Sequence, residues 1–118
     1  MRGTRDAAPA AGQDVVMVSV PATLSPAATT GREAFNANCA ACHGINGAGN
    51  DGHGPPLIHR IYEPNHHGDD SFRLAALHGV RAHHWPFGNM PAQPQVSPGE
   101  IETIIAYVRE VQQANGIR

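Results

Sequence analysis

The chain has 118 residues, the length of one small domain with a thin core, and a net charge of −2 with histidine neutral. All eight basic residues are arginine, and charges of both signs are scattered, so the composition indicates neither a nucleic-acid partner nor a polyanionic tail. The 13 glycines and 10 prolines predict short helices joined by much irregular backbone. Their combined fraction of the chain is below that typical of disordered proteins.

Residues 1–28 are rich in alanine, proline, serine and threonine, with one extended stretch at 15–21, and predict a flexible arm or linker. Arg2 and Arg5 resemble the basic start of an export signal. The apolar stretch that follows, 15–18, is too short for the core of a signal or for a membrane span. We therefore expect a mature or trimmed chain without a membrane span.

The first predicted helix follows this arm. Thr29 or Thr30 is expected to cap a helix that runs through Phe35 towards Cys42. Residues 44–56 are rich in glycine and end in two prolines, so this segment is expected to be a loop.

A second helix is predicted after residue 68. Asp69, Asp70 or Ser71 can cap it, and Gly79 stands just past its expected end, where a helix-ending residue belongs. Residues 81–96 hold three prolines and are expected to form another long loop.

The last predicted helix has the strongest local signal. Ser97 and Glu100 form a capping box with Pro98 at the first helical position, and apolar side chains follow at helical spacing. The helix is expected to end at 114–116. Without an alternating strand pattern, residues 29–118 predict one all-α domain with three main helices and long loops.

The motif Cys39-Ala-Ala-Cys42-His43 carries the chemistry. Each thiol can add to a haem vinyl group to form a thioether, and the next residue then presents its imidazole to the iron. We therefore predict one covalently bound haem c, held by Cys39 and Cys42 and ligated by His43. Two alternatives are a CxxC redox pair, which belongs in a βαβ context, and a zinc site, for which other histidines would have to supply the remaining ligands.

The same motif predicts where the protein works. Thioether formation needs reduced thiols, reduced haem and dedicated assembly machinery, and in bacteria this chemistry takes place beyond the cytoplasmic membrane. We expect a periplasmic protein, although the chain shows no export signal.

From about residue 31 to residue 116 the chain resembles class I cytochrome c. The resemblance is carried by Gly31 and Phe35 before the motif, by Gly54-Pro55-Pro56-Leu57, by Asn89-Met90-Pro91 and by the apolar helix at 104–108. It implies the cytochrome c fold, in which the first and last helices cross. Gly31 and Phe35 would then face Ile104 and Tyr107.

The resemblance also implies the remaining site residues. Met90 would be the second axial ligand of the iron, with a histidine as the chief rival, and the candidates are His78, His83 and His84. Pro55 would offer its carbonyl to the free ring nitrogen of His43, and Leu57 would contact the haem. For Trp85 two roles stay open, donation of its indole N–H to a haem propionate or plain packing beside the haem. Tyr62 and Arg60 are further candidates for the propionates.

An iron with six ligands has no open position for a substrate, so the expected function is one-electron transfer and not catalysis. We predict a monomeric carrier between extracytoplasmic redox proteins whose identities the sequence does not give. Because the chain has no lysine, its docking face is expected to be weakly charged, with small residues such as Ala40, Ala41 and Ala92 near the haem edge. Two alternatives stay open: a subunit or domain of a larger oxidoreductase, and a haem sensor or enzyme with a displaceable sixth ligand.

Overall fold

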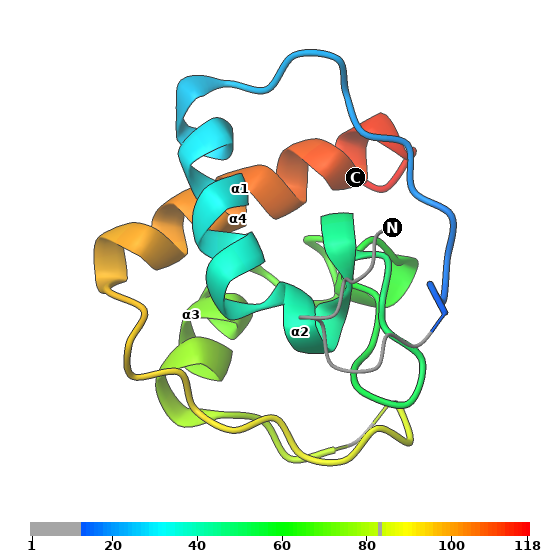
Figure 1. Ribbon diagram of the computed structural model, residues 1–118, viewed down its shortest axis with the longest axis vertical. Coiled ribbons are helices and arrows are strands. Elements are labelled where there is room, and N and C mark those ends of the chain that lie inside the picture. The colour runs from blue at the N-terminus through cyan, green and yellow to red at the C-terminus, as the bar shows by residue number, and fades with distance from the viewer. Residues whose placement is uncertain (1–12, 83) are drawn as a thin grey trace, which may run out of the picture.

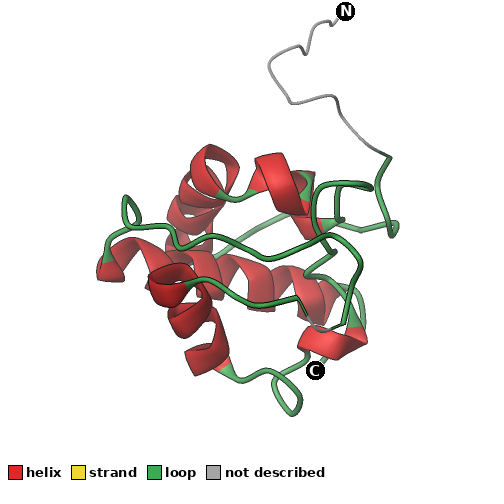
Figure 2. Ribbon diagram, turned by 90° about the horizontal axis from the view of Figure 1, so that it is seen from below, coloured by secondary structure: helices red, strands yellow, loops and turns green. Residues whose placement is uncertain are grey.

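The computed structural model describes residues 13–82 and 84–118. Within them the regular structure is helical, and β pairing is limited to isolated bridges. The four α-helices, labelled in Figure 1 and red in Figure 2, are α1 (Pro26–Asn38), α2 (Ala40–His43), α3 (Asp69–His78) and α4 (Pro98–Ala114). Two short 3-10 turns, η2 (Ile45–Gly47) and η3 (Arg60–Tyr62), lie between them. For the described residues, this confirms the predicted all-α fold with three main helices and long loops.

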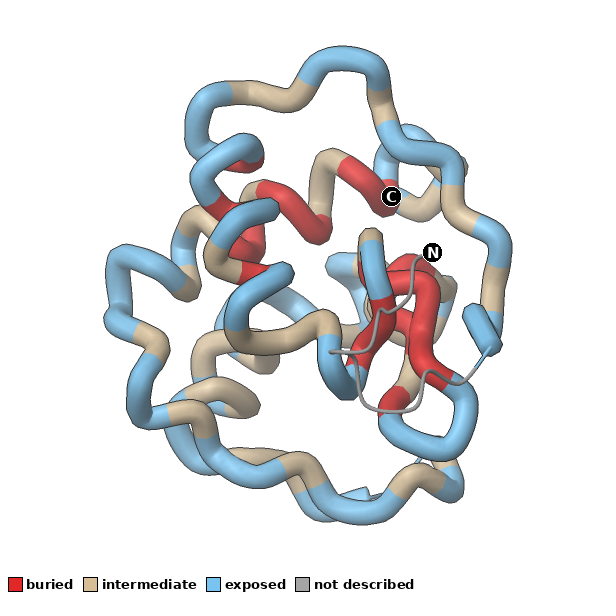
Figure 3. The backbone as a smooth tube through the Cα atoms, in the orientation of Figure 1, coloured by how far each residue is buried: buried red, intermediate tan, exposed pale blue. Residues whose placement is uncertain are grey.

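Helix α1 crosses α4 in the upper half of the view in Figure 1. The crossing is close because Gly31 has no side chain: a Cβ there would run into the backbone carbonyl of Thr103. Next to this point the rings of Phe35 and Tyr107 pack with centroids 5.4 Å apart. The predicted crossing of the first and last helices is confirmed, and its residues form much of the buried core (Figure 3).

Helix α1 begins earlier than the sequence analysis predicted. Its N-cap is Ser25, whose hydroxyl accepts from the backbone N–H of Ala28 at 3.1 Å, and Pro26 takes the first helical position. Ser25 also donates through its hydroxyl, at 2.5 Å, and its backbone N–H, at 3.0 Å, to the carboxylate of Glu110 on α4. The predicted cap at Thr29 or Thr30 is therefore wrong, and the boundary placed after residue 28 falls inside α1.

The described part of the expected arm, residues 13–25, packs on the domain. The backbone N–H groups of Val15 and Val16 both donate to the carbonyl of Ala48 at 3.0 Å. Further along, the Asn115 side chain bonds the backbone N–H and carbonyl of Ser19 at 2.9 and 2.7 Å. These contacts differ from the predicted flexible arm, whose residues 1–12 lie outside the described part of the chain.

The ends of α3 and α4 show which local signals succeed. Helix α4 has the predicted capping box and ends at Ala114, inside the expected range. Gly79 ends α3 as predicted, but the N-cap is Gly68, not one of the three polar residues that follow it. Asp69 and Asp70 lie in the first helical turn instead, where each carboxylate pairs with an arginine, Arg109 and Arg73 respectively.

The segment between α3 and α4 is the long loop predicted at residues 81–96. In Figure 1 it leaves the end of α3, runs along the side of the molecule farthest from the start of α1, and returns to α4. The helix crossing and this loop therefore lie on opposite sides of the middle of the domain. Among the described helices none is both long enough and apolar enough to cross a membrane.

Candidate functional site

A cavity of about 480 Å³ lies between the helix crossing and the long loop, and its volume is within the range of cofactor pockets. Its lining is mostly apolar and, in the described residues, includes no aspartate, glutamate, lysine or arginine. The apolar wall draws on every main helix and includes Phe35, Leu57, Phe72, Leu74, Val80, Phe87, Val96, Ile101, Ile104 and Val108. A bulky, largely apolar group would fill this space.

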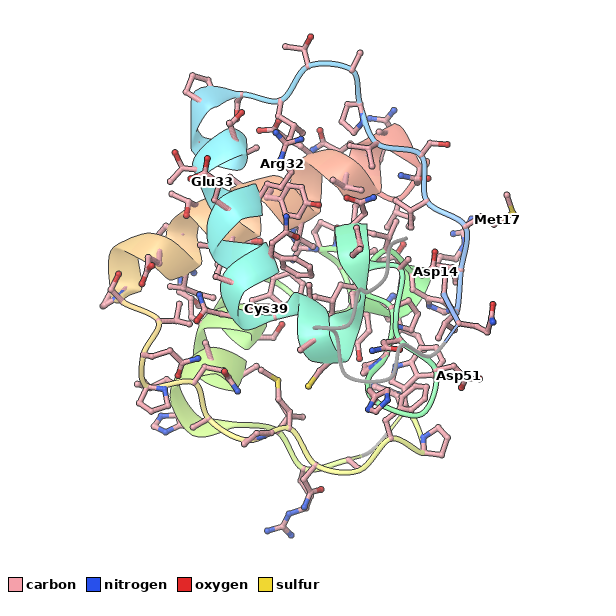
Figure 4. The ribbon with its side chains drawn as sticks, in the orientation of Figure 1. Asp14, Met17, Arg32, Glu33, Cys39 and Asp51 are labelled. Atoms are coloured by element: carbon pink, nitrogen blue, oxygen red, sulfur yellow. The ribbon has the colours of Figure 1, made fainter. Side chains whose placement is uncertain are left out.

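The motif forms one tight turn at the edge of the cavity. Helix α1 ends at Asn38, and Cys39 turns the chain into α2, with the N–H groups of Cys42 and His43 donating to the Cys39 carbonyl at 3.1 and 2.8 Å. Figure 4 places Cys39 at the foot of α1, where that helix meets α2. Cys39 lines the main cavity, whereas the exposed Cys42 lines an adjoining hollow of about 70 Å³.

The environment of the thiols disfavours both alternatives to haem attachment. Burial, with a smaller effect from neighbouring Cys42, raises the pKa of the Cys39 thiol to about 11, whereas a reactive CxxC pair needs a lowered pKa. The βαβ context of such a pair is absent from the described residues. Those residues also contain no group of three or more histidine, cysteine, aspartate or glutamate side chains that could hold a metal ion.

His43 is buried, and one of its ring nitrogens is already engaged. Its Nδ1 lies 2.9 Å from the carbonyl oxygen of Pro55, and since a carbonyl only accepts, Nδ1 carries the proton and donates. This is the contact predicted for Pro55. Burial lowers the pKa of His43, with a smaller opposing effect from the Pro55 bond, so the ring is neutral and Nε2 keeps its lone pair.

Met90 is held by its backbone. Its N–H and carbonyl form a bridge with Val80, at 2.8 and 2.9 Å, and the neighbouring Asn89 accepts from the N–H of Ala82 at 2.8 Å. Met90 and His43 line both the main cavity and the adjoining hollow. The long loop therefore brings the thioether to the same space as the imidazole.

Two of the rival histidines are more exposed than Met90. His78 and His84 also line the cavity, but both are exposed. The ring of His84 packs edge to face against His67, with centroids 5.5 Å apart. The third candidate, His83, lies outside the described residues.

Trp85 lines the cavity with Leu57 and Tyr62. Its indole N–H donates to the hydroxyl of Tyr62 at 3.0 Å. The expected role of Trp85 beside a haem, as propionate donor or as packing, stays a prediction. Burial, offset in part by the Trp85 bond, raises the pKa of Tyr62, so its hydroxyl keeps a proton that it can donate in turn. The other candidate, Arg60, is exposed and outside the lining.

Sequence reasoning missed several polar residues that hold this site together. Asn50 is buried and donates to the Ala41 carbonyl at 2.9 Å, which fixes the glycine-rich loop against α2. Asn46 has a φ of 60° and accepts from the hydroxyl of Tyr107 at 3.0 Å. An asparagine in a glycine-rich loop is a recognisable signal for such a turn, although its distant partner is not.

The residues present fit a haem. Two thiols, one imidazole with a fixed tautomer and one thioether converge on an apolar cavity, and this donor set suits haem iron. The Tyr62 hydroxyl, which accepts from Trp85, lines the same cavity and could donate its proton to a carboxylate of such a group.

A comparison with protein families agrees with this geometry. The family model described as Cytochrome c matches residues 28–112. Comparisons with curated proteins and with solved structures give no match.

Proposed function

This chain belongs to the cytochrome c family, which implies haem-based electron transfer, and from that premise we propose that it is a periplasmic one-electron carrier. Cys39 and Cys42 would hold one haem c covalently, and His43 and Met90 would ligate its iron. The observation that carries the proposal is that His43 and Met90 line one apolar cavity beside the two thiols.

When bound, the haem supplies an iron that changes between the ferric and ferrous states. The protein's residues keep the site the same in both. The Pro55 carbonyl fixes the plane and tautomer of the His43 ring, and the backbone bridge to Val80 fixes the position of Met90. The apolar wall limits access of water. With His43 and Met90 both available as iron ligands, a bound haem would have no open position for a substrate, and outer-sphere electron transfer would be the remaining chemistry.

We further propose that the carrier is monomeric and exchanges electrons with redox proteins through a weakly charged face. Support comes from the absence of lysine and from the lining of the adjoining hollow, which in the described residues holds no aspartate, glutamate or arginine. A short-lived contact of this kind suits a shuttle, whose partners must separate after each transfer.

The test is to produce the chain with an export signal in bacteria that assemble c-type cytochromes, and to measure the mass of the denatured protein. We expect an increase of one haem per chain, which is lost in the Cys39→Ala/Cys42→Ala double variant. Carbon monoxide added to the ferrous protein should bind slowly, because Met90 has to leave first. A wild-type chain that carries no covalent haem contradicts the proposal.

Two results would replace the carrier function with an alternative. Rapid carbon monoxide binding would indicate a displaceable sixth ligand and a sensor or an enzyme. Stable co-purification with a large oxidoreductase would indicate a subunit.

A further inference from the structure

Arg109, on α4, has a guanidinium group surrounded by acceptors. Its side chain is 12% exposed. Nη1 donates to the carbonyl of Tyr62 at 2.6 Å and to the side chain of Gln112 at 2.8 Å, and Nη2 donates to the carbonyl of His67 at 2.6 Å. Nε donates to Asp69 at 2.8 Å. Each of the three nitrogens therefore has a protein acceptor, and two of these acceptors are backbone carbonyls.

Gln112, about one helical turn further along α4, also donates to backbone carbonyls. It is 1% exposed, and its Nε2 donates to the carbonyls of Leu57 and Tyr62, both at 3.0 Å. Together with Arg109 it thus holds three carbonyls of residues 57–67, which we call the wall segment. Apart from the short turn η3 this segment has no regular structure, so its course depends on such side-chain bonds.

The wall segment forms one side of the cavity through Leu57, Tyr62 and His67. It also touches the long loop opposite: the Tyr62 hydroxyl accepts from Trp85, and the His67 ring packs against His84. The same loop carries Met90. A continuous series of contacts therefore runs from α4 through the wall segment to the loop that presents the axial methionine.

Arg109 supports the cavity by a second route. Its guanidinium carbon lies 4.7 Å above the centre of the Phe72 ring, a cation–π contact, and Phe72 lines the cavity from α3. The pair with Asp69 fixes the start of that helix. Arg109 itself is absent from the cavity lining.

We propose that Arg109, assisted by Gln112, is a positioning residue that holds the wall segment and the long loop closed over the haem and so raises the reduction potential. This inference rests on the proposed function, because it needs a bound haem. A loosened wall admits water to the iron site. Water stabilises the more highly charged ferric form, so a loosened wall lowers the potential.

The proposal requires the shape of arginine and not only its charge. A guanidinium group donates along fixed directions and reaches separate carbonyls together, whereas an ammonium is a point donor on a flexible stem. Arg109→Lys keeps the charge and removes this geometry. Gln112→Leu removes the neighbouring donor at similar volume.

The control is Arg73→Lys. Arg73 also joins α3 to α4, through Glu102 at 2.7 and 2.9 Å, and it bonds Asp70 of its own helix at 2.5 Å. It lies at the surface, and none of these bonds is to a carbonyl of the wall segment. Arg73→Lys therefore removes an arginine contact between these two helices and leaves the hydrogen bonds to the wall segment intact.

The experiment compares the haem-loaded wild type and the three variants by redox titration and by hydrogen exchange of backbone amides. We expect lower potentials in Arg109→Lys and Gln112→Leu, faster exchange of the Tyr62, Glu63 and His67 amides, and wild-type behaviour in Arg73→Lys. Hydrogen bonds within the wall segment protect these three amides.

A merely structural role for Arg109 would lower the denaturation midpoint and leave the potential of the folded protein unchanged, and that result overturns the inference. An equal shift in Arg73→Lys overturns it as well. If Arg109→Lys does not accumulate as a folded protein, a wild-type potential in Gln112→Leu is decisive against the inference. Failure of the proposed function is distinct, because it shows in the wild type as the absence of a haem spectrum.

Discussion

At the scale of single residues, His43 shows how burial and one hydrogen bond select a ligand. The Pro55 carbonyl holds the proton on Nδ1, and burial keeps the ring neutral, so the remaining nitrogen is a lone-pair donor. The two effects act oppositely on the pKa, and burial is the larger. The imidazole is thus prepared for a metal before any metal binds.

This state of His43 predicts loss of stability in mild acid. In the folded protein the pKa lies below 6.5, its value in the unfolded chain, so the unfolded state takes up a proton first as the pH falls. In the chain without bound haem, the free energy of unfolding should therefore be constant well above pH 6.5 and fall as the pH drops below it. Urea unfolding of the Cys39→Ala/Cys42→Ala variant, which carries no attached haem and leaves the His43 ring free to take up a proton, measures this at several pH values. A midpoint that stays constant as the pH falls below 6.5 contradicts it.

Gly31 is the residue on which the helix crossing depends most directly. A Cβ at this position would overlap the carbonyl of Thr103 on α4, so Gly31→Ala has to push the helices apart. We expect a loss of about 3 kcal/mol in the free energy of unfolding, the upper part of the usual range for overpacking.

The matched control for this substitution is Gly99→Ala. Gly99 lies in the first turn of α4 with no atom near an added Cβ, so this change should leave stability unchanged or raise it by up to about 0.5 kcal/mol. Chemical denaturation measures both variants, and equal effects would contradict the close crossing.

How well residues could be predicted from the sequence depended on how far away their partners are. Cys39, Cys42 and His43 act within five consecutive positions, so the motif alone indicates their role. Arg109 acts through carbonyls 42 and 47 residues away, and no local pattern specifies those partners. Trp85 could be placed near the cavity by resemblance, but its acceptor, Tyr62, could not.

At the scale of elements, local capping signals were reliable where the helix end is decided locally. Ser97, Pro98 and Glu100 gave the correct start of α4. Ser25-Pro26 is the same Ser-Pro signal and gives the true start of α1, so this start was readable from the sequence. The cap of α3 was not: Asp69 pairs instead with Arg109 of α4, 40 residues away, and Asp70 with Arg73 of the same helix.

The turn between α3 and the long loop fixes the place of Met90. Gly79 has φ 79° and ψ −179°, a conformation that is essentially restricted to glycine, and an added Cβ would lie 2.5 Å from the carbonyl oxygen of Met90. Gly79→Ala should therefore displace Met90 and weaken the methionine charge-transfer band of the ferric protein.

Gly88→Ala is the control for that prediction. Gly88 also has a positive φ, 90°, but no atom lies near an added Cβ, so this variant carries backbone strain without a clash at Met90. Its band should stay close to that of the wild type. A band of unchanged intensity in Gly79→Ala would show that the turn does not position the ligand.

At the scale of the whole molecule, the distribution of charge decides how the protein meets its partners. The net charge is small, and the described residues that line the cavity and the adjoining hollow include no carboxylate, ammonium or guanidinium group. Charges elsewhere on the surface are screened over about 10 Å at 0.1 M salt. Steering by long-range electrostatics should therefore be weak.

Electron self-exchange between ferric and ferrous copies of the protein tests this directly. We expect the rate to change by less than about threefold between low and physiological salt, because little charge lies at the edge through which electrons pass. Ala41→Glu, next to Cys42, should make the dependence much steeper. A steep dependence in the wild type would contradict a weakly charged face.

The proposed electron-carrier function depends above all on ligation of the iron by His43 and Met90, and the absorption spectrum of the oxidised protein measures this ligation most directly. We predict a low-spin spectrum with a weak charge-transfer band in the red, typical of methionine-ligated ferric haem, which disappears in Met90→Ala. A low-spin spectrum without that band would indicate that a histidine is the sixth ligand, and a lower reduction potential would then be expected. A high-spin spectrum would contradict the electron-carrier function, because it would show an iron with an open position at which a ligand or substrate can bind.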